Sequence, residues 1–159
     1  MKYRILMVCL GNICRSPLAE GVLRKRLDEA GLGSVVAVDS AGTSNYHIGE
    51  TPDKRSVANA RRHRVDISTL RARQFVVADF DAFDEIFVMD AENLSNVLRL
   101  AQNDAHRSKT DLLLNQAWPG SNRAVPDPYY GGEEGFEHVF QLVNEACEAV
   151  VGRLQKQLA

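Results

Sequence analysis

Ile5-Leu6-Met7-Val8-Cys9-Leu10-Gly11-Asn12-Ile13-Cys14-Arg15-Ser16 is a short apolar run that leads directly into a loop of small, polar and reactive residues. Four consecutive apolar residues are typical of a central parallel strand that is buried on both faces. Pro17 follows, and proline is favoured at the start of a helix. The stretch therefore predicts a strand, a tight loop and a helix whose positive end points back at the loop.

The loop can surround one tetrahedral oxyanion, because five residues separate a thiol from an arginine. Cys9 would lie beneath the anion, and Arg15 beside it could donate two parallel hydrogen bonds. An ordinary thiol is only a few per cent ionised at neutral pH, so we expect Arg15, the loop amides and the helix N-terminus to stabilise a thiolate. Ser16 can donate to the sulfur, Gly11 allows close backbone approach, and Asn12 tolerates a left-handed conformation. The loop is predicted to hold a nucleophile aimed at phosphorus.

The composition is that of an ordinary globular protein. The chain has 159 residues, of which 45% are hydrophobic and 25% charged, so we expect one domain spanning residues 1–159. A net charge of −2 gives no reason to expect nucleic acid as a partner. No apolar stretch approaches the roughly 18 residues of a membrane span, and no secretory signal is recognisable. With an odd number of cysteines, these features favour a reducing, cytoplasmic location.

Strand-like and helix-like segments alternate along the rest of the chain. Further strands are predicted at 35–38, 86–89 and 112–114, and helices at about 17–30, 52–63, 91–101 and 133–157, with Thr51 and Asp90 as N-caps. Such alternation predicts a parallel sheet with helices on both faces. Ligands of such sheets bind beyond the carboxyl ends of the strands, which is where Cys9 lies.

The segment Val125-Pro126-Asp127-Pro128-Tyr129-Tyr130 is the best candidate to supply a proton for the leaving oxygen. Proline on both sides restricts the backbone and favours an extended conformation at Asp127. A carboxyl group held over a dianionic phosphate is expected to keep its proton near neutral pH, because burial and like charge both disfavour its ionised form. The alternative is a simple Asp-Pro turn, and the phosphate loop favours the acid.

Other loops that bind phosphate or metal do not fit. A nucleotide P-loop would end in Gly-Lys-Ser or Gly-Lys-Thr, which this chain lacks. Gly31 and Gly33 follow a predicted helix rather than a strand, so a dinucleotide-binding pattern is missing. Cys9 and Cys14 have no second ligand pair for zinc. The remaining alternative is a structural one, with two buried cysteines at a strand end and a surface arginine.

Together, the Cys-x5-Arg-Ser loop and the late Asp127-Pro128-Tyr129-Tyr130 resemble the low-molecular-weight protein tyrosine phosphatases over essentially the whole chain. The resemblance implies a four-stranded parallel sheet flanked by helices, with the phosphate-binding loop after the first strand. It also implies hydrolysis of phosphotyrosine and small aryl phosphates without metal or cofactor. By this resemblance Cys9 attacks phosphorus to give a cysteinyl phosphate and Arg15 clamps the oxygens. Asp127 then protonates the leaving phenolate and later activates water.

The resemblance also implies residues that contact or support the substrate. The expected binding residues are Leu10, Gly11, Asn12, Ile13, Cys14, Ser16, Tyr46 and Tyr129, supported by Ser40 and Tyr130. Ile13, Tyr46 and Tyr129 would line a deep cleft that sandwiches an aromatic ring, while Ser40 would hold Asn12. The implied partners are phosphotyrosine-containing proteins and a tyrosine kinase that acts on Tyr129 or Tyr130.

Other activities on the same loop are less consistent with the residues. A related group of protein arginine phosphatases has threonine where this chain has Ile13, so Ile13 favours phosphotyrosine. Arsenate reductases that share the loop need two further cysteines near the third strand, and residues 75–92 contain none. A module that only binds phosphate would need neither the Cys9 thiolate nor an acid at Asp127.

Several residues remain open to two interpretations. Cys14 is either a buried structural thiol or a partner that captures oxidised Cys9 as a disulfide. Cys147 falls on the inward stripe of the last helix and is predicted to lie in the core. The basic residues Arg61, Arg62, His63, Arg64, Arg71 and Arg73 form either a solvated face or a guide for acidic phosphopeptides.

Overall fold

A parallel sheet lies at the centre of the computed structural model, which describes residues 2–129 and 132–158. Its strands are β1 (Tyr3–Cys9), β2 (Val36–Gly42), β3 (Glu85–Val88) and β4 (Thr110–Leu112), in the spatial order β2-β1-β3-β4. Residues 5–8 of β1 are completely buried, because neighbouring strands flank them and helices cover both faces. The predicted four-stranded parallel sheet is confirmed.

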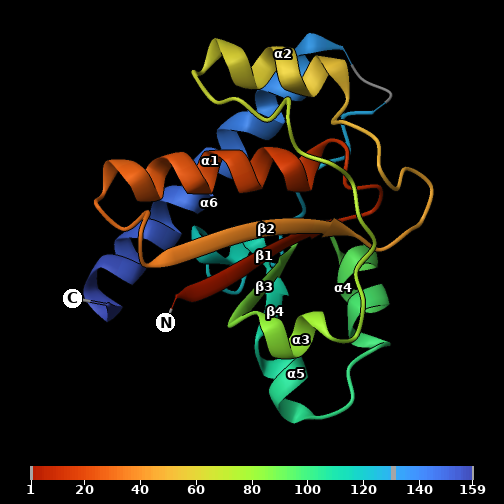
Figure 1. The fold of residues 1–159 in the computed structure, drawn as a ribbon, viewed down its shortest axis with the longest axis vertical. Helices are drawn as coiled ribbons and strands as arrows, with labels where there is room; N and C mark the ends of the chain where they lie inside the picture. The colour runs from red at the N-terminus through yellow and green to blue at the C-terminus, as the bar shows by residue number, and fades with distance from the viewer. Residues whose placement is uncertain (1, 130–131, 159) are drawn as a thin grey trace.

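Helices cover both faces of this sheet. They are α1 (Arg15–Glu29), α2 (Lys54–Arg62), α3 (Asp79–Ala82), α4 (Ala91–Leu98), α5 (Asp104–Ser108), the 3-10 helix η1 (Leu113–Gln116) and α6 (Glu133–Gln157). Figure 1 shows α1, α2 and α6 on one side of the sheet and α3, α4 and α5 on the other. In the described parts of the chain, no helix is both long and apolar enough to cross a membrane.

Alternate residues of β1 join two separate cores. Ile5 and Met7 pack with α1 and α6, whereas Leu6 and Val8 pack in a second core with Phe80 of α3. This division follows from the two-residue period of a strand. Because β1 is anchored from both faces, the position of the loop that follows Cys9 is fixed by the cores rather than by the loop alone.

Two helices begin at other residues than the sequence predicts. α1 starts at Arg15 instead of Pro17, so the last residues of the loop form its first turn and Pro17 occupies a position where no N–H is needed. α2 starts at Lys54 instead of Pro52, because Asp53 rather than Thr51 provides the N-cap. The Asp53 carboxylate accepts a hydrogen bond of 2.8 Å from the backbone N–H of Arg55.

The second and fourth strands also differ from their predicted bounds. β2 runs on to Gly42 and therefore includes Ser40. β4 ends at Leu112, while Leu113 and Leu114 belong to η1 and are completely buried in the core that contains α6. The prediction of a strand over 112–114 is therefore wrong for Leu113 and Leu114, because their apolar character reflects burial in a 3-10 helix. The last helix, with bounds Glu133–Gln157, and Asp90 as the N-cap of α4 are confirmed.

His63 makes the closest contacts between the end of α2 and α6. His63 stacks on Phe140 with a centroid separation of 3.6 Å, and its Nε2 lies 2.8 Å from Oε1 of Glu137. The Asn59 side chain donates a 2.9 Å hydrogen bond to the same oxygen. α2 in turn covers the phosphate loop, because the Ser56 hydroxyl donates to the Cys14 carbonyl. The His63–Glu137 contact therefore supports the loop indirectly.

This contact predicts a pH-dependent contribution to stability. The hydrogen bond with His63 lowers the pKa of Glu137 from 4.5 to about 2, against a smaller opposing effect of burial. Because the folded state binds the proton more weakly than the unfolded state, this stabilisation is present above about pH 4.5 and is lost as the pH falls towards about 2. We expect Glu137→Gln to have a lower free energy of unfolding above that window and a weaker acid dependence within it, as measured by urea unfolding.

Glu145→Gln is a matched control, since Glu145 is an exposed carboxylate on the same helix. It should retain the wild-type acid dependence. An acid dependence of Glu137→Gln equal to that of the control would contradict the assignment.

Candidate active site

The loop at residues 9–16 turns its carbonyl groups outward and its N–H groups inward. Three carbonyls accept hydrogen bonds from the surrounding chain: Cys9 from Thr43 N at 2.9 Å, Leu10 from Ser44 N at 3.0 Å, and Ile13 from Asp53 N at 2.8 Å. The N–H groups of Gly11, Ile13 and Cys14 find no protein acceptor among the residues that the structure describes. The loop and the N-terminus of α1 therefore present donors to a shared centre, which is the requirement for binding an oxyanion.

The sulfur of Cys9 lies at the base of this ring of donors and is almost completely buried. Its Sγ lies 3.0 Å from Oγ of Ser16, and the backbone N–H of Asn12 donates to it at 3.3 Å. Asn12 has a φ of 57°, the left-handed conformation that its residue type tolerates. Gly42 lets β2 approach the loop closely, because a Cβ there would lie 2.7 Å from the Leu10 carbonyl oxygen. The sulfur thus has two possible hydrogen-bond donors within reach, the Ser16 hydroxyl and the Asn12 N–H.

Arg15 is held by groups from two other segments. Its Nη1 donates to Oδ2 of Asp90 at 2.7 Å and to the Val125 carbonyl at 3.1 Å. Burial would lower the pKa of Arg15, but the nearby Cys9 sulfur and Asp90 carboxylate raise it above its ordinary value. Asp90 caps α4 through its other oxygen, as predicted, and the contact with Arg15 gives it a second role at the site. One carboxylate therefore fixes both the helix and the guanidinium.

Asp127 lies beside the Arg15 guanidinium at the pocket, as predicted for a proton donor. Its Oδ2 is 3.8 Å from Nη2 of Arg15, and its Oδ1 accepts from the Tyr129 N–H at 3.0 Å. The preceding Val125 is completely buried and donates its N–H to the Met89 carbonyl at the end of β3. Buried Val125 thus fixes the position of the segment that contains Asp127, while the Asp127 carboxylate itself remains half-exposed.

These groups surround one pocket of about 280 Å³. The predicted site residues that line it are Cys9, Leu10, Gly11, Ile13, Cys14, Arg15, Tyr46, Asp127 and Tyr129. His47, which the sequence analysis did not single out, lines it as well, with its ring against Gly11 and its Nδ1 3.0 Å from Glu50. His47 directly follows Tyr46 in the sequence, and this position next to a predicted pocket residue could have identified it as a lining residue. Tyr130 lies outside the described residues.

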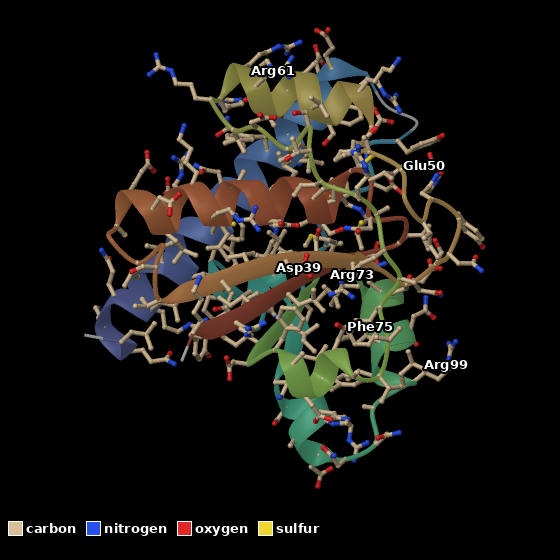
Figure 2. All side chains as sticks on the ribbon, in the orientation of Figure 1. Asp39, Glu50, Arg61, Arg73, Phe75 and Arg99 are labelled. Atoms are coloured by element: carbon tan, nitrogen blue, oxygen red, sulfur yellow. The ribbon has the colours of Figure 1, made fainter. Side chains whose placement is uncertain are left out.

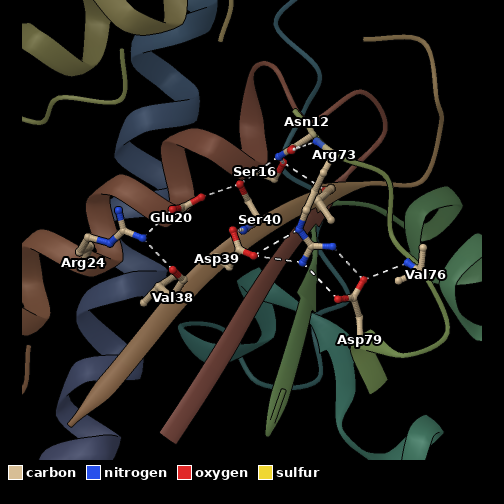
Figure 3. A network of polar contacts seen from close by, with 11 residues as sticks. Asn12, Ser16, Glu20, Arg24, Val38, Asp39, Ser40, Arg73, Val76 and Asp79 are labelled. Atoms are coloured by element: carbon tan, nitrogen blue, oxygen red, sulfur yellow. Dashed lines mark hydrogen bonds and ion pairs between the residues drawn. The ribbon is translucent and has the colours of Figure 1, made fainter. Parts of the chain in front are cut away.

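Asn12, Ser16 and Ser40 form a buried network behind the pocket (Figure 3). The Asn12 side chain donates to Ser16 at 2.8 Å and to Ser40 at 3.0 Å. The Ser40 hydroxyl donates to buried Glu20 at 2.6 Å, so its oxygen must accept from Asn12. Since Ser16 also accepts from Asn12, its own proton is available to the Cys9 sulfur. Burial raises the pKa of Glu20, and its contacts with Ser40 and Arg24 oppose that shift.

Arg73 holds this network in place through Asn12. It does not belong to the solvated basic face that the sequence predicted. Its backbone N–H donates to Oδ1 of Asn12 at 3.0 Å, and its guanidinium donates to the carboxylates of Asp39 and Asp79 (Figure 3). His63, as described above, is occupied by Glu137. The prediction of one solvated basic face is therefore wrong for these two residues, because buried or half-buried carboxylates pair with them.

The three cysteines are all free and buried. Burial raises the pKa of the Cys14 thiol, so Cys14 is a neutral thiol that lines the same pocket as Cys9. This arrangement accommodates both interpretations of Cys14. Cys147 is completely buried on α6, so its predicted place in the core is confirmed.

Comparisons with known proteins give one consistent result. The family model for low molecular weight phosphotyrosine protein phosphatases matches residues 4–159. A low molecular weight protein-tyrosine-phosphatase of Streptomyces coelicolor is 41% identical over alignments that cover 99% of this chain and 97% of that protein. A protein tyrosine phosphatase from Entamoeba histolytica, solved with Hepes in its active site, superposes with a TM-score of 0.92 at 35% identity, covering 99% and 100%. The drosophila arginine phosphatase DARP superposes with a TM-score of 0.87 at 30% identity, covering 98% of each chain.

The contact between Ser16 and Cys9 predicts a change in thiol reactivity. Ser16→Ala removes a donor to the sulfur, and a hydrogen bond to a charged group contributes about 1.5–3 kcal/mol. We expect alkylation of Cys9 by iodoacetamide at neutral pH to be about 10- to 100-fold slower in Ser16→Ala than in the wild type. Ser56→Ala removes a nearby buried hydroxyl that bonds to the Cys14 carbonyl, and it should leave the rate unchanged. Equal rates for both variants would show that Ser16 does not stabilise the thiolate.

Proposed function

Because the chain belongs to the low molecular weight phosphotyrosine protein phosphatase family, we propose that its residues 1–159 act as one phosphatase domain that hydrolyses phosphotyrosine through a cysteinyl phosphate on Cys9. The observation that carries this proposal is the convergence of the Cys9 thiol, the Arg15 guanidinium and the Asp127 carboxyl group on one pocket. A site that only bound phosphate would need neither a nucleophile nor an acid.

In the first step the Cys9 thiolate attacks phosphorus, a sulfur–phosphorus bond forms, and the bond from phosphorus to the phenolic oxygen breaks. The inward N–H groups of the loop and the charged guanidinium of Arg15 stabilise the equatorial oxygens. Asp127 donates a proton to the leaving oxygen, because its carboxyl group stands at the mouth of the pocket beside Arg15.

In the second step Asp127 takes a proton from water, which attacks phosphorus and releases inorganic phosphate. The sulfur–phosphorus bond breaks, and Cys9 leaves as a thiolate. Ser16, 3.0 Å from the sulfur, supports this leaving group by donating a hydrogen bond. The residues of the Asn12 network position the hydroxyl and take no part in bond changes.

The pocket walls support an aryl phosphate as substrate. Tyr46 is 72% exposed and Tyr129 39% exposed, so each offers a flat apolar surface that a phenyl ring could contact. Ile13 adds an aliphatic wall without a polar group for a guanidinium. Phosphoarginine is the second candidate, because DARP is named an arginine phosphatase and shares this fold. We also propose small aryl phosphates, with acid phosphatase activity, as substrates.

The physiological setting is likewise a proposal. Phosphotyrosine-containing proteins are the proposed substrates and the cytoplasm the proposed location, given the free thiols and the family membership. The proposed regulator is a tyrosine kinase that acts on the half-exposed Tyr129. Tyr130, the other tyrosine proposed as its target, lies outside the described residues.

The decisive experiment measures release of nitrophenolate from nitrophenyl phosphate in the presence of EDTA, followed by turnover of phosphotyrosine, phosphoserine and phosphoarginine peptides. We expect turnover of nitrophenyl phosphate and of phosphotyrosine, and none in Cys9→Ser. Undiminished turnover in Cys9→Ser would overturn the nucleophile assignment. Faster turnover of phosphoarginine than of phosphotyrosine would show that Ile13 does not determine the choice of substrate.

Removal of the proposed acid gives a separate prediction. Asp127→Ala and the isosteric Asp127→Asn should each slow kcat for a phosphotyrosine peptide by about 10²- to 10⁴-fold, the usual contribution of a general acid. The effect should be smaller for a phenol that leaves readily without a proton. A loss below about threefold would show that another group supplies the proton.

A further inference from the structure

We propose that a groove beside the catalytic pocket binds the polypeptide that flanks the phosphotyrosine, and that Arg99 selects an acidic residue in that polypeptide. The groove runs between the loop at residues 43–46 and helix α4, and it has a volume of about 470 Å³. This inference rests on the proposed function and extends it from the phosphoryl group to the surrounding substrate.

The groove adjoins the catalytic pocket. Leu10 and Tyr46 line both cavities, so the exposed ring of Tyr46 forms a partition between them. A phosphotyrosine side chain that reaches Cys9 therefore leaves its own backbone near the entrance to the groove. The nearest polypeptide to occupy it is the segment adjacent to that phosphotyrosine.

The groove has an apolar floor and one exposed apolar wall. Phe75 and Val97 are buried beneath it, while Leu100 is 42% exposed at its side. Figure 2 shows Phe75 on the α4 side of the sheet and Arg99 at the far end of α4. An exposed leucine beside a buried apolar floor offers a contact for an apolar side chain of a substrate.

Amide side chains line the groove above this floor. Asn45 and Asn96 line it, and their side chains make no hydrogen bond to any residue that the structure describes. An amide both donates and accepts, so it can pair with the N–H and C=O groups of an extended peptide. The groove therefore has the chemistry to hold peptide backbone without regard to sequence.

Charge along α4 adds a preference for sequence. Glu92, Asn96 and Arg99 lie on one face of the helix at a spacing of four and three residues. Glu92 is near the catalytic pocket, because the preceding Asp90 contacts Arg15. Arg99 lies about 10 Å further along at 1.5 Å per residue. In the described parts of the chain neither Glu92 nor Arg99 has an ion-pair partner.

These positions predict the order of charges in a preferred substrate. An extended peptide advances about 3.3 Å per residue, so Arg99 lies about three residues beyond the position opposite Glu92. A negative charge directly beside the phosphotyrosine would be repelled by Glu92. A negative charge at about the fourth residue would be attracted by Arg99.

The test uses phosphotyrosine peptides that carry either Glu or Lys at the fourth residue, on the N-terminal or the C-terminal side, with Arg99→Glu as the variant. On one of the two sides, wild-type protein should prefer the Glu peptide. Arg99→Glu should lower kcat/KM for that peptide by about three- to tenfold and raise it for the matching Lys peptide. Turnover of nitrophenyl phosphate, which does not reach the groove, should be unchanged.

Arg61→Glu is the matched control, because it makes the same charge change on an exposed residue of α2, at the opposite end of the molecule in Figure 2. It should leave the preference between Glu and Lys peptides intact. An equal change for both peptides in Arg99→Glu, or no preference by the wild type on either side, would overturn the groove proposal.

Binding of the same peptides to Cys9→Ser, followed by fluorescence, separates this proposal from the proposed function. Cys9→Ser could bind the Glu peptide more tightly than the Lys peptide while the wild type hydrolyses neither. This result would overturn the proposed hydrolysis and support the groove. Alternatively, the wild type could hydrolyse phosphotyrosine peptides and nitrophenyl phosphate while Cys9→Ser binds the Glu and Lys peptides equally well. This result would support the hydrolysis and overturn the groove.

Discussion

The hydrogen bonds of Asn12 hold the anion-binding loop in the conformation that directs its N–H groups at the anion. The residue adopts a left-handed conformation, which places its backbone N–H on the Cys9 sulfur. Its side chain then connects the first turn of α1, strand β2 and the segment that contains Arg73. Because these connections are buried, an incorrect arrangement would leave several polar groups without partners. The loop amides consequently remain directed at the anion.

Two buried charged side chains near the carboxyl edge of the sheet, Arg15 and Glu20, have fixed partners. Arg15 has Asp90, and Glu20 has Ser40 and Arg24. Each pair limits the cost of removing a charge from water. Part of the guanidinium of Arg15 nevertheless remains directed towards Asp127 and the pocket. The fold thus holds a charged donor in place before the phosphate arrives, and binding needs little reorganisation.

α4 connects the chemistry of the loop with the recognition of a larger substrate. Its N-cap Asp90 orients Arg15, and its exposed face continues away from the pocket to Arg99. The same helix therefore positions a group at phosphorus and offers charged and amide side chains to the neighbouring polypeptide. In the proposed mechanism the loop determines which bond is broken, and in the proposed groove α4 influences which phosphotyrosine reaches the loop.

Local patterns predicted the main strands and the long helices, but they did not predict α3, α5 or the bounds of β4. The apolar run 5–8, the 3.6-residue period of 133–157 and the capping residue Asp90 each depend on neighbours in the sequence, and the structure agrees with them. Leu113 and Leu114 were assigned to a strand instead of the 3-10 helix, because a short apolar run has the same sequence pattern in a buried strand and in a buried helical turn.

The sequence by itself predicted a parallel α/β fold, the anion-binding loop and the candidate groups Cys9, Arg15 and Asp127. Spacing within one loop specifies Cys9 and Arg15, and the prolines on both sides single out Asp127. Only the tertiary structure decided that Glu20 orients Ser40, that Arg73 anchors Asn12 and that Asp90 holds Arg15. It also decided that the α4 groove adjoins the catalytic pocket. Those contacts join residues from different strands and helices, and side-chain pairs across such separations leave no periodic signal in the chain.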